Sequence, residues 1–378
     1  MGLETADFIV IGGGIAGASA AYELREMGKV ILLEKENLPG YHSTGRSSAI
    51  FQKGYNKGDP LINILVTASE DFLHNPPKDF TPHTLLTPRA LIHIAAADNQ
   101  NILDDLHENL SAINVQSDFI DGQAAIRLLP ILAADYQTRA LREQGTADMD
   151  VNALHAGYLH GLKASGGTII TEANVTGLTR KKNHWQVAST KGLFQAPTIV
   201  NAAGSWVDQV AQMAGISPIN IRPLRRTVIM VTLPEGLSCA QWPLVMNPAE
   251  GYYFKPDSGK ILMTPGDEQL ALPCNIQPEE IDIAYGAHYL EQATNLTVAK
   301  IDRSWAGLRN RVADGHPVVG FDPEAEGFFW LAGQGGYGIK TAPAMARISA
   351  SLISGHGLPQ DMLALGLQEE QISIRRLK

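Results

Sequence analysis

The chain has 378 residues, of which 44% are hydrophobic and 18% charged, so it has the composition of a globular protein and the length for two domains or one interleaved pair. Its formal net charge of -9 gives no reason to bind nucleic acid or an anionic membrane, because both need a basic surface. Two cysteines, Cys239 and Cys274, support neither a disulfide framework nor a thiolate metal site. No signal peptide pattern or membrane-spanning apolar run is found. We expect a cytoplasmic protein, at most peripheral to the inner membrane.

The first apolar segments predict one βαβ unit. Residues 8–11 read as a buried parallel strand, and residues 15–27 read as a helix that ends at Gly28. Residues 30–33, Val-Ile-Leu-Leu, read as the next strand. This order predicts a parallel pair of strands joined by a crossover helix.

The turn between the first strand and the helix carries a glycine pattern. Residues 12–17, Gly-Gly-Gly-Ile-Ala-Gly, fit G-x-G-x-x-G, in which the glycines permit a tight turn, close approach of a pyrophosphate and close packing of helix on strand. Glu34 ends the next strand about 20 residues further on, where a carboxylate accepts hydrogen bonds from ribose hydroxyls and repels the 2′-phosphate of NADP. The segment predicts a dinucleotide site that FAD and NAD fit equally.

After residue 33 the predicted elements depart from the βαβ pattern, and later segments resume it. The predicted elements are a helix over residues 151–162, strands at 168–170, 198–200 and 227–231, a hairpin over 252–263 with its turn at Asp257-Ser258-Gly259, a strand at 327–332 and a helix that reaches Ser351. Residues 69–132 carry only a weak pattern. The hairpin and the strand before it predict a separate, β-rich sheet.

Three further segments indicate which dinucleotide is bound. Residues 39–48, Pro-Gly-Tyr-His-Ser-Thr-Gly-Arg-Ser-Ser, form a small polar loop after the acidic residue. Residues 201–206, Asn-Ala-Ala-Gly-Ser-Trp, and residues 333–339, Gly-Gln-Gly-Gly-Tyr-Gly-Ile, each follow a predicted strand. In these segments the chain resembles the D-amino acid oxidase superfamily of FAD-dependent oxidoreductases. The resemblance implies that the third segment begins a helix whose positive end stabilises reduced, anionic flavin.

The resemblance implies an α/β FAD-binding Rossmann-like domain of the glutathione reductase type, interleaved with an α+β substrate domain built on an antiparallel sheet. We expect an FAD-binding domain of residues 1–50, 145–222 and 300–378, and a substrate-binding domain of residues 51–144 and 223–299. The expected FAD contacts are Gly12, Gly14, Ile15, Ala16, Gly17, Glu34, Lys35, Ser43, Thr44, Gly45, Arg46, Ser47, Val175, Ala203, Gly204, Trp206, Gly335, Gly336, Tyr337, Gly338 and Ile339. No Cys occurs in the late segment and His42 is not at the linked position of covalent members, so noncovalent FAD is expected.

Within the superfamily the chain looks most similar to bacterial FAD-dependent D-arginine dehydrogenases. The segments that carry this resemblance are residues 39–48, 75–77, 153–159, 305–309 and 334–339. It implies that Arg226 and Arg309 grip the substrate carboxylate and that Tyr55 and Tyr253 complete the grip. Arginine suits this role because its planar guanidinium binds a carboxylate through two donors, and a pair can fix an amino acid with its Cα–H toward flavin N5.

The chain departs from the D-arginine pattern in the pocket for the side chain. Leu91 stands at the position of the family's guanidinium-binding Glu, and Ile50 stands at a histidine position. D-Arginine is disfavoured, because a buried guanidinium without a carboxylate has no partner for its charge. Ile50 and Leu91 favour an apolar or small neutral side chain, whereas Lys53 leaves an acidic one open. Gly307 and Gly336 complete the expected pocket.

The resemblance implies oxidative deamination of a D-amino acid, with an apolar or neutral side chain favoured, to an imino acid, which hydrolyses to a 2-oxo acid and ammonia, with hydride transfer to flavin N5. The reacting amine must be neutral, so the rate should rise with pH, and no dedicated base is required. Two alternatives are a glycine- or sarcosine-type amine oxidase and a 2-hydroxy acid dehydrogenase. The latter needs a base, and His42 is the only histidine in the predicted flavin-facing motifs.

The expected partners are a small amino acid and an electron acceptor, which is a quinone, a dye-like acceptor or O2. No metal is expected.

Overall fold

The computed structural model describes residues 3–377. Outside the described residues lie Met1, Gly2 and Lys378. The first two belong to the N-terminal segment that lacks a predicted signal peptide. Its centre is a six-stranded sheet with the order β10-β3-β2-β14-β21-β20. The first five strands are parallel, and β20 is antiparallel to β21. The strands are β2 (Phe8–Ile11), β3 (Val30–Leu33), β10 (Thr168–Ile170), β14 (Thr198–Asn201), β20 (Val318–Phe321) and β21 (Phe328–Ala332).

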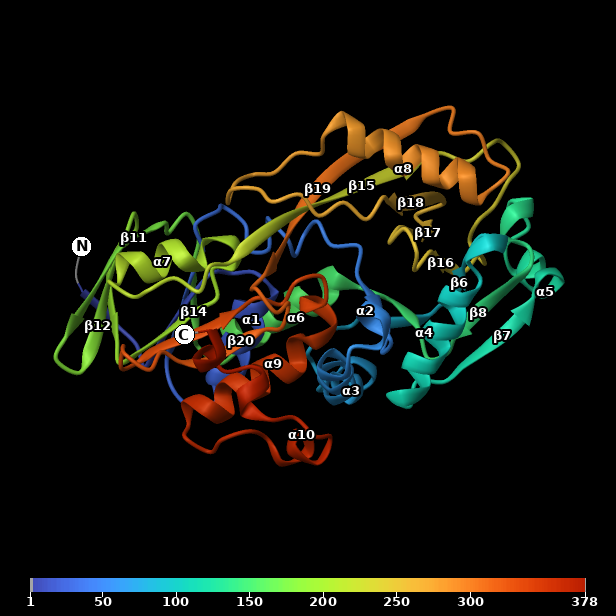
Figure 1. Cartoon of the computed structure of the whole chain (residues 1–378). Helices are drawn as coiled ribbons and strands as arrows, with labels where there is room; N and C mark the ends of the chain where they lie inside the picture. The colour runs from blue at the N-terminus through green and yellow to red at the C-terminus, as the bar shows by residue number, and fades with distance from the viewer. Residues whose placement is uncertain (1–2, 378) are drawn as a thin grey trace.

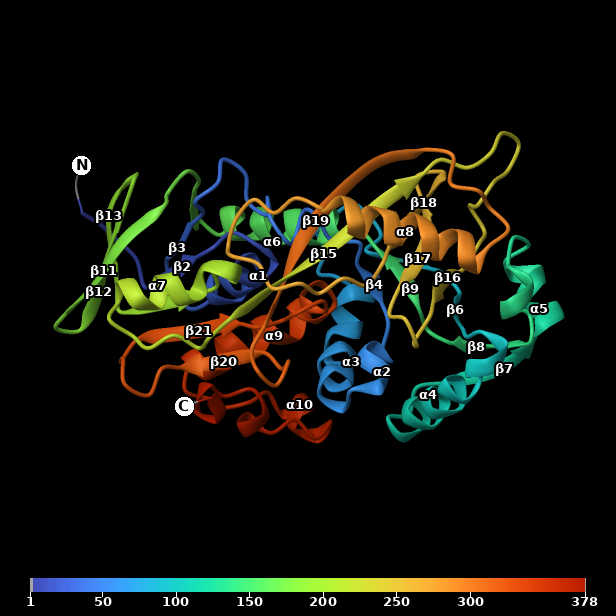
Figure 2. The same cartoon turned by 45° about the horizontal axis from the view of Figure 1, so that its top comes forward.

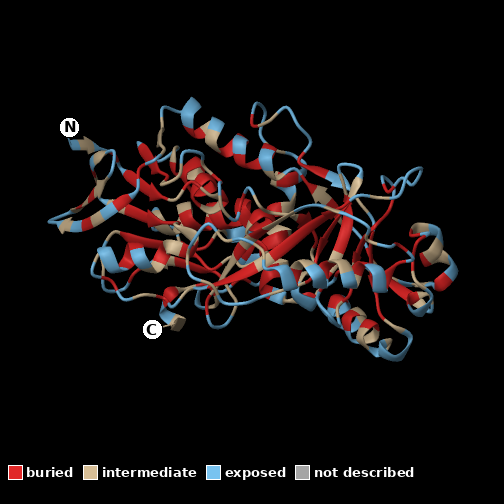
Figure 3. Ribbon diagram, turned by 90° about the horizontal axis from the view of Figure 1, so that it is seen from above, coloured by how far each residue is buried: buried red, intermediate tan, exposed pale blue. Residues whose placement is uncertain are grey.

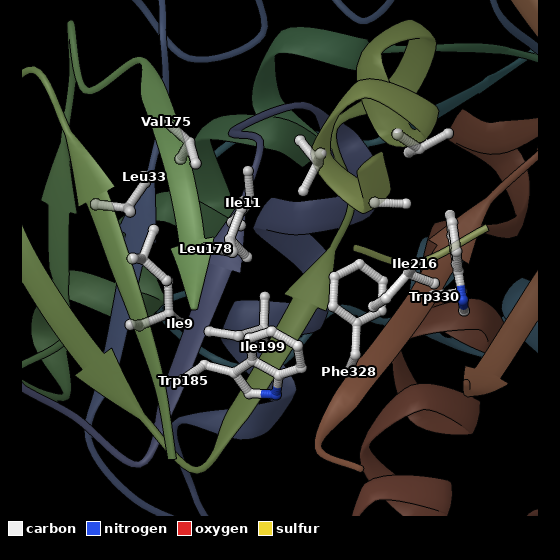
Figure 4. Close-up of a cluster of buried hydrophobic side chains, with 14 of the residues drawn as sticks. Ile9, Ile11, Leu33, Val175, Leu178, Trp185, Ile199, Ile216, Phe328 and Trp330 are labelled. Carbon is white, nitrogen blue, oxygen red and sulfur yellow. The ribbon is translucent and has the colours of Figure 1, made fainter. Parts of the chain in front are cut away.

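Helices cover one face of this sheet, and a second, four-stranded sheet with the order β1-β13-β12-β11 covers the other (Figures 1 and 2). Alternate residues of a strand point to opposite faces, so Val10 packs toward the helices and Ile9 toward the second sheet. There Trp185 packs edge-on against Phe328, with ring centroids 5.9 Å apart (Figure 4). The elements of these layers are α1 (Ile15–Leu24), α3 (Pro60–His74), α6 (Val151–Ala164), α7 (Val207–Met213), α9 (Gly338–Ile353), α10 (Gln360–Ala364), β1 (Leu3–Thr5), β11 (Val175–Lys181), β12 (His184–Ser189) and β13 (Gly192–Ala196).

An eight-stranded sheet with the order β19-β15-β18-β17-β16-β6-β8-β7 forms the second part of the molecule. Neighbouring strands are antiparallel except β6 and β16, which run parallel. Helix α8 packs on β15 and β18, and α4 and α5 pack against β7 and β8 (Figure 1). The elements are β6 (Leu91–Ile94), β7 (Ser117–Asp121), β8 (Arg139–Glu143), β15 (Arg222–Val231), β16 (Leu244–Met246), β17 (Tyr253–Asp257), β18 (Lys260–Thr264), β19 (Ile301–Arg311), α4 (Asn101–Ala112), α5 (Gly122–Leu128) and α8 (Glu280–Ala293).

A three-stranded sheet with the order β4-β9-β5 lies between the two parts. Its strands are β4 (Ile50–Phe51), β5 (Leu86–Pro88) and β9 (Ala147–Met149), and the short helix α2 (Tyr55–Gly58) follows β4. In this turn Asn56 and Lys57 have left-handed φ values of 55° and 59°, which non-glycine residues adopt rarely. Buried residues concentrate in the strands and at the inner sides of the helices (Figure 3).

The predicted fold class is confirmed: a Rossmann-like parallel sheet is combined with a largely antiparallel one. The predicted hairpin turn is also present, with Ser258 and Gly259 at φ 51° and 76°, the two positive values of a tight type I′ hairpin turn. Helix α1 ends at Leu24, before the predicted end at Met27. Strands β15 and β19 pair over their length and run from one part toward the other (Figure 2), so the domain limits drawn from the sequence stay a prediction.

Candidate active site

One cavity of about 580 Å³ lies between the carboxyl ends of the parallel strands and one face of the eight-stranded sheet. Its walls come from the glycine-rich turn after β2, the loop after β3, the segment after β14, the turn before α9 and strands β15, β16, β17 and β19. Ligands of open parallel sheets bind at these strand ends. The cavity therefore joins the predicted cofactor segments to the predicted substrate residues.

The glycine-rich turn is packed so closely that side chains are excluded. A Cβ on Gly12, whose φ is 106°, would lie 2.5 Å from the carbonyl oxygen of Ala202. A Cβ on Gly17 would lie 1.9 Å from the carbonyl oxygen of Gly12. Gly14, in contrast, faces the cavity and has only the Thr44 hydroxyl near it, at 3.4 Å. Gly12 and Gly17 bring helix α1 against β2, which leaves the turn open to a phosphate group.

Glu34 stands beside this turn at the end of β3. It is 7% exposed, and its two carboxylate oxygens accept hydrogen bonds from the backbone N–H groups of Gly13 and Glu36, both at 2.8 Å. Burial raises the pKa of Glu34, and these two hydrogen bonds oppose the rise. Each carboxylate oxygen has two lone pairs, so acceptor capacity is left for ribose hydroxyls. His155 on α6 holds the turn from behind by donating to the Gly13 carbonyl oxygen at 2.8 Å.

The polar loop of residues 39–48 connects the two halves of the cavity. Thr44 Oγ1 accepts a hydrogen bond from the Ile15 backbone N–H at 2.9 Å at the start of α1, and Ser43 Oγ donates to the Leu308 carbonyl oxygen on β19 at 2.7 Å. Arg46 Nη1 donates to the carbonyl oxygens of Ile276 and Ala306 at 2.9 and 3.0 Å. The guanidinium of Arg46 thus binds backbone on the substrate side while the residue lines the cavity.

Most of the expected FAD contacts meet at this cavity. Those that line it are Gly12, Gly14, Ile15, Ala16, Glu34, Lys35, Ser43, Thr44, Arg46, Ser47, Val175, Ala203, Gly204, Trp206, Gly335, Gly336, Gly338 and Ile339. Gly17 and Gly45 instead pack against backbone, and the buried Tyr337 donates its hydroxyl hydrogen bond to the Gly315 carbonyl oxygen at 2.9 Å. The glycine turn, the carboxylate beside it and the glycine-rich start of α9 form a continuous wall that fits a dinucleotide with a planar ring system.

Arginines gather where β15 and β19 face the cavity. Arg226 Nη2 donates to Glu268 Oε1 at 2.8 Å, Arg309 Nη1 lies 3.7 Å from the same oxygen, and Arg311 donates to both oxygens of Glu268 at 2.9 and 3.1 Å. Burial, together with the charge of Arg309, lowers the pKa of Arg226 to about 10. The buried Nε of Arg226 has no hydrogen-bond partner within residues 3–377. The carboxylate of Glu268 therefore holds the guanidinium groups together at this wall.

Two tyrosines flank the arginines. A Cβ on Gly336 would lie 2.3 Å from the Tyr55 hydroxyl and 2.8 Å from Arg309 Cζ, so both side chains lie directly on this glycine. The Tyr253 hydroxyl lies 2.5 Å from Ser48 Oγ. The structure therefore brings together the four residues predicted to grip the substrate, and Gly336 provides the space for two of them.

The predicted side-chain pocket is only partly assembled. Ile50 and Gly307 line the cavity with Gly336. Leu91 is 1% exposed and packs with Ile50 and Leu244 in a small apolar cluster, behind the cavity wall. Lys53 forms an ion pair with Glu70 at 2.6 Å and does not line the cavity, so the structure gives no support to Lys53 as the partner of an acidic substrate.

Several residues at the cavity were missed by the sequence analysis. Gln52, His93 and Lys340 line it, the carboxylate of Glu143 lies behind them, and Glu268 lies among the arginines. One signal was present for His93: it follows Leu91 by two residues on the same strand and therefore shares its face. Lys340 lies in the first turn of α9, directly after the glycine-rich segment, and no local pattern indicated it.

Within residues 3–377, no group of His, Cys, Asp and Glu is arranged to hold a metal ion. The same residues include no helix long and apolar enough to cross a membrane.

Comparison with known proteins identifies the cofactor. The family model described as FAD dependent oxidoreductase (DAO) matches residues 7–352. The chain belongs to this family. FAD is thus the dinucleotide that the cavity binds, and the protein is an FAD-dependent oxidoreductase, as the sequence predicted.

Individual relatives of this flavoenzyme are distant but cover almost its whole length. It is 24% identical over 368 residues to the glycine oxidase of Geobacillus kaustophilus (strain HTA426), with 92% of each chain covered. It is 26% identical to the sarcosine oxidase subunit beta of Rhizobium meliloti (strain 1021), covering 95% of this chain and 86% of that protein. The structure of dithionite-reduced L-alpha-glycerophosphate oxidase from Mycoplasma pneumoniae with FAD bound has a TM-score of 0.85 at 18% identity, covering 93% and 95% of the two chains; this likeness concerns the fold. The closer resemblance to D-arginine dehydrogenases stays a prediction.

Proposed function

We propose that this flavoenzyme oxidises the Cα–N bond of a small α-amino acid, and that D-amino acids with neutral side chains are its substrates. The observation that carries the proposal is the pair Arg226 and Arg309, whose guanidinium groups share one wall of the FAD cavity with the hydroxyls of Tyr55 and Tyr253. Two guanidinium groups side by side suit a carboxylate, which accepts from both. The preference for D-amino acids rests on the sequence resemblance.

Each residue has a defined task in this proposal. Arg226 and Arg309 bind the α-carboxylate, and Tyr55 and Tyr253 offer hydroxyls beside it. Gly336 keeps the space in front of Arg309 open, because any larger residue would meet Tyr55 and the guanidinium. The carboxylate anchor holds the amino acid in one orientation in the FAD cavity. FAD supplies the acceptor for the hydride, and the imino acid product hydrolyses in water to a 2-oxo acid and ammonia.

A second candidate, oxidation of glycine or of a secondary amine such as sarcosine, is favoured by the relatives named above, a glycine oxidase and a sarcosine oxidase subunit. The same arginine pair serves both candidates, because both substrates carry an α-carboxylate. They differ in what the cavity must accommodate: a side chain on Cα in the first case and a methyl group on nitrogen in the second.

Anaerobic absorbance spectra of the purified flavoprotein separate the candidates. The protein is titrated with D-leucine, D-asparagine, D-glutamate, D-arginine, glycine, sarcosine and the L-enantiomers of the chiral compounds. Bleaching of the flavin by neutral D-amino acids is the expected result. Bleaching by glycine or sarcosine alone would support the second candidate in place of the first, and no bleaching by any of these compounds would contradict both. A quinone, a dye or O2 is then supplied to identify the electron acceptor.

A further inference from the structure

A second cavity, of about 330 Å³, lies beside the FAD cavity, and the two share part of their walls. Both cavities are lined by Tyr55, Asn56, Glu268 and Arg311. The other walls of the second cavity come from the start of β15, the end of β19 with the loop that follows it, and the start of α3. We call it the outer cavity. Because the walls are shared, the outer cavity adjoins the proposed substrate site.

Four arginines follow one another along one face of the ribbon that β15 and β19 form (Figure 2). Alternate residues of a strand share a face, so Arg222 and Arg226 on β15 lie on the same side of the ribbon. In the register of the two strands, Arg222 is opposite Arg311 and Leu224 is opposite Arg309. We call this set the arginine row; in order along the ribbon it consists of Arg222, Arg311, Arg309 and Arg226.

The arginine row runs from the protein surface inward. Arg222 is exposed and lines the outer cavity. The side chains of Arg311, Arg309 and Arg226 are 27%, 17% and 11% exposed, in that order. Arg311 lines both cavities, and Arg309 and Arg226 line the FAD cavity. A carboxylate that enters through the outer cavity therefore meets a guanidinium group at each step toward the proposed substrate site.

Carboxylates balance few of the charges in the arginine row. Glu268 contacts Arg226 and Arg311 and lies 3.7 Å from Arg309, so one carboxylate serves three guanidinium groups. The guanidinium of Arg222 has no ion pair and no side-chain hydrogen bond within residues 3–377. Like charges directly opposite each other on paired strands are destabilising. The pair of Arg222 and Arg311 therefore costs stability unless an anion binds near it.

The arginine on the other face of the ribbon is balanced. Arg225 is buried, and its Nε and Nη2 donate to Asp282 Oδ2 at 3.1 and 2.9 Å. Glu279 accepts a further hydrogen bond from Arg225 Nη1. Two carboxylates thus serve one arginine there, whereas one carboxylate serves three arginines on the cavity face. The excess of positive charge lies on the face that lines the two cavities, which indicates a surface for an anionic group.

The acidic residues on the other walls of the outer cavity have partners of their own. Asp59, the N-cap of α3, has its Oδ2 3.1 Å from His316 Nε2, and Asp314, in the loop after β19, accepts from Arg376 Nε at 2.7 Å. Cationic groups thus lie on the strands, and acidic groups lie on α3 and the loop. An amino acid carries both charges, so its carboxylate fits the strand wall while its ammonium group fits the acidic wall.

We infer that the outer cavity is a second binding site for the substrate, where the α-carboxylate of an amino acid binds Arg222 and Arg311 before it passes along the arginine row to Arg309 and Arg226. This inference rests on the proposed function, because it takes Arg309 and Arg226 as the final carboxylate site. Glu268 lines both cavities and contacts arginines of both sites. Its carboxylate therefore separates the outer position of the ligand from the inner one.

Rapid mixing of the holoenzyme with 4-methylpentanoate, the deaminated form of leucine, tests the inference independently of turnover. The change in flavin absorbance reports arrival at the inner site. Because the outer site fills first, the observed rate constant should level off as the concentration of 4-methylpentanoate rises, and the half-saturating concentration measures binding at the outer site. Higher ionic strength should raise this concentration, since salt screens the exposed Arg222. An observed rate constant that rises linearly with concentration would overturn the inference.

Variants at exposed positions locate the effect. Arg222→Gln should raise the half-saturating concentration about tenfold, because it removes one charged partner of the carboxylate. Arg222→Lys keeps the charge and should restore most of this loss. Arg303→Gln removes the same charge from an exposed position of β19 that lines neither cavity, and it should behave as the wild type. An unchanged half-saturating concentration in Arg222→Gln, or equal effects of Arg222→Gln and Arg303→Gln, would show that the inference is wrong.

The outcomes also separate this inference from the proposed function. A rate constant that saturates and depends on Arg222, without bleaching of the flavin by any amino acid, would retain the outer carboxylate site and reject the oxidation of amino acids. Bleaching by amino acids, together with rate constants that do not depend on Arg222, would retain the proposed function and reject the outer site.

Discussion

The two walls of the cavity present different parts of the chain to their ligands. On the wall formed by the parallel sheet, backbone atoms of glycine-rich turns face the cofactor, and the side chains there, such as Glu34 and Thr44, mainly hold the turn in place. On the wall formed by the eight-stranded sheet, the ligand faces side chains from distant segments, among them Arg226, Arg309 and His93. Backbone recognition depends on how closely elements pack, whereas side-chain recognition depends on which charges meet.

The cofactor wall should be sensitive to added volume. Replacing Gly17 with valine would place a Cβ 1.9 Å from the Gly12 carbonyl oxygen, which separates α1 from β2 and closes the pyrophosphate turn. We expect purified protein with little or no FAD and a strongly lowered melting temperature, measured by absorbance and calorimetry. Gly177→Ala, at a position with nothing within 4 Å of the added Cβ, serves as control. Normal FAD content in Gly17→Val would contradict the backbone account.

The substrate wall should be sensitive to the geometry of its charges at constant charge. Arg309→Lys keeps the positive charge but loses the planar pair of donors, so kcat/KM for the best amino acid should fall by about 100-fold or more. FAD content should stay normal, which distinguishes the two walls. Arg303→Lys on the exposed part of the same strand is the control. Steady-state kinetics decide, and an unchanged kcat/KM would remove Arg309 from the substrate site.

The buried amine of Lys340 should leave a signature in the pH dependence of stability. Burial lowers its pKa from 10.5 to about 7, against the opposing effect of Glu143. Between these two values the unfolded chain binds a proton that the folded protein does not, so the destabilisation grows as the pH falls from 10.5 and is complete below 7. Lys340→Met removes it. The unfolding free energy of the variant relative to wild type should therefore rise by about 4 kcal/mol between pH 10 and pH 6.

Denaturant unfolding at several pH values measures this difference, and Lys163→Met, which makes the same chemical change at an exposed position, serves as control. A constant difference across the range would show that Lys340 keeps its ordinary pKa in the folded protein.

The smallest expected effect concerns Glu268, whose carboxylate contacts Arg226 and Arg311 and lies 3.7 Å from Arg309. Glu268→Gln retains a hydrogen-bond acceptor for Arg226 and removes the negative charge that competes with the substrate. Carboxylates such as 4-methylpentanoate should bind roughly fivefold more tightly, which corresponds to about 1 kcal/mol. Flavin absorbance titration measures the change, with the exposed Glu280→Gln on α8 as control. Weaker binding would mean that Glu268 positions the arginines.

Much of the fold followed from local patterns. The strand of residues 8–11, the glycine turn after it and Glu34 were predicted together, because packing of a helix on a parallel strand around a phosphate restricts residues close in sequence. The hairpin with Ser258 and Gly259 at its turn was predicted for the same reason, since two positive φ values select particular residues. The arginines and tyrosines of the substrate site came only from the resemblance to a family.

The side-chain pocket was predicted least well. Lys53 lies near Ile50 in sequence, yet its ammonium group pairs with Glu70, and Leu91 lies behind the wall. Neighbours in sequence on a strand point to opposite faces, and the direction in which a long side chain turns depends on charges supplied by other elements. For the same reason nothing in the residues around Lys340 indicated that Glu143 lies near it.

The sequence by itself determined the parallel dinucleotide-binding unit and the residues of its phosphate turn, because steric limits on backbone conformation act over a few residues and glycine alone satisfies them. Only the tertiary structure decided what the substrate meets. Gln52 after β4, His93 on β6 and Lys340 on α9 all line the cavity, and they come together only when these elements are packed against one another.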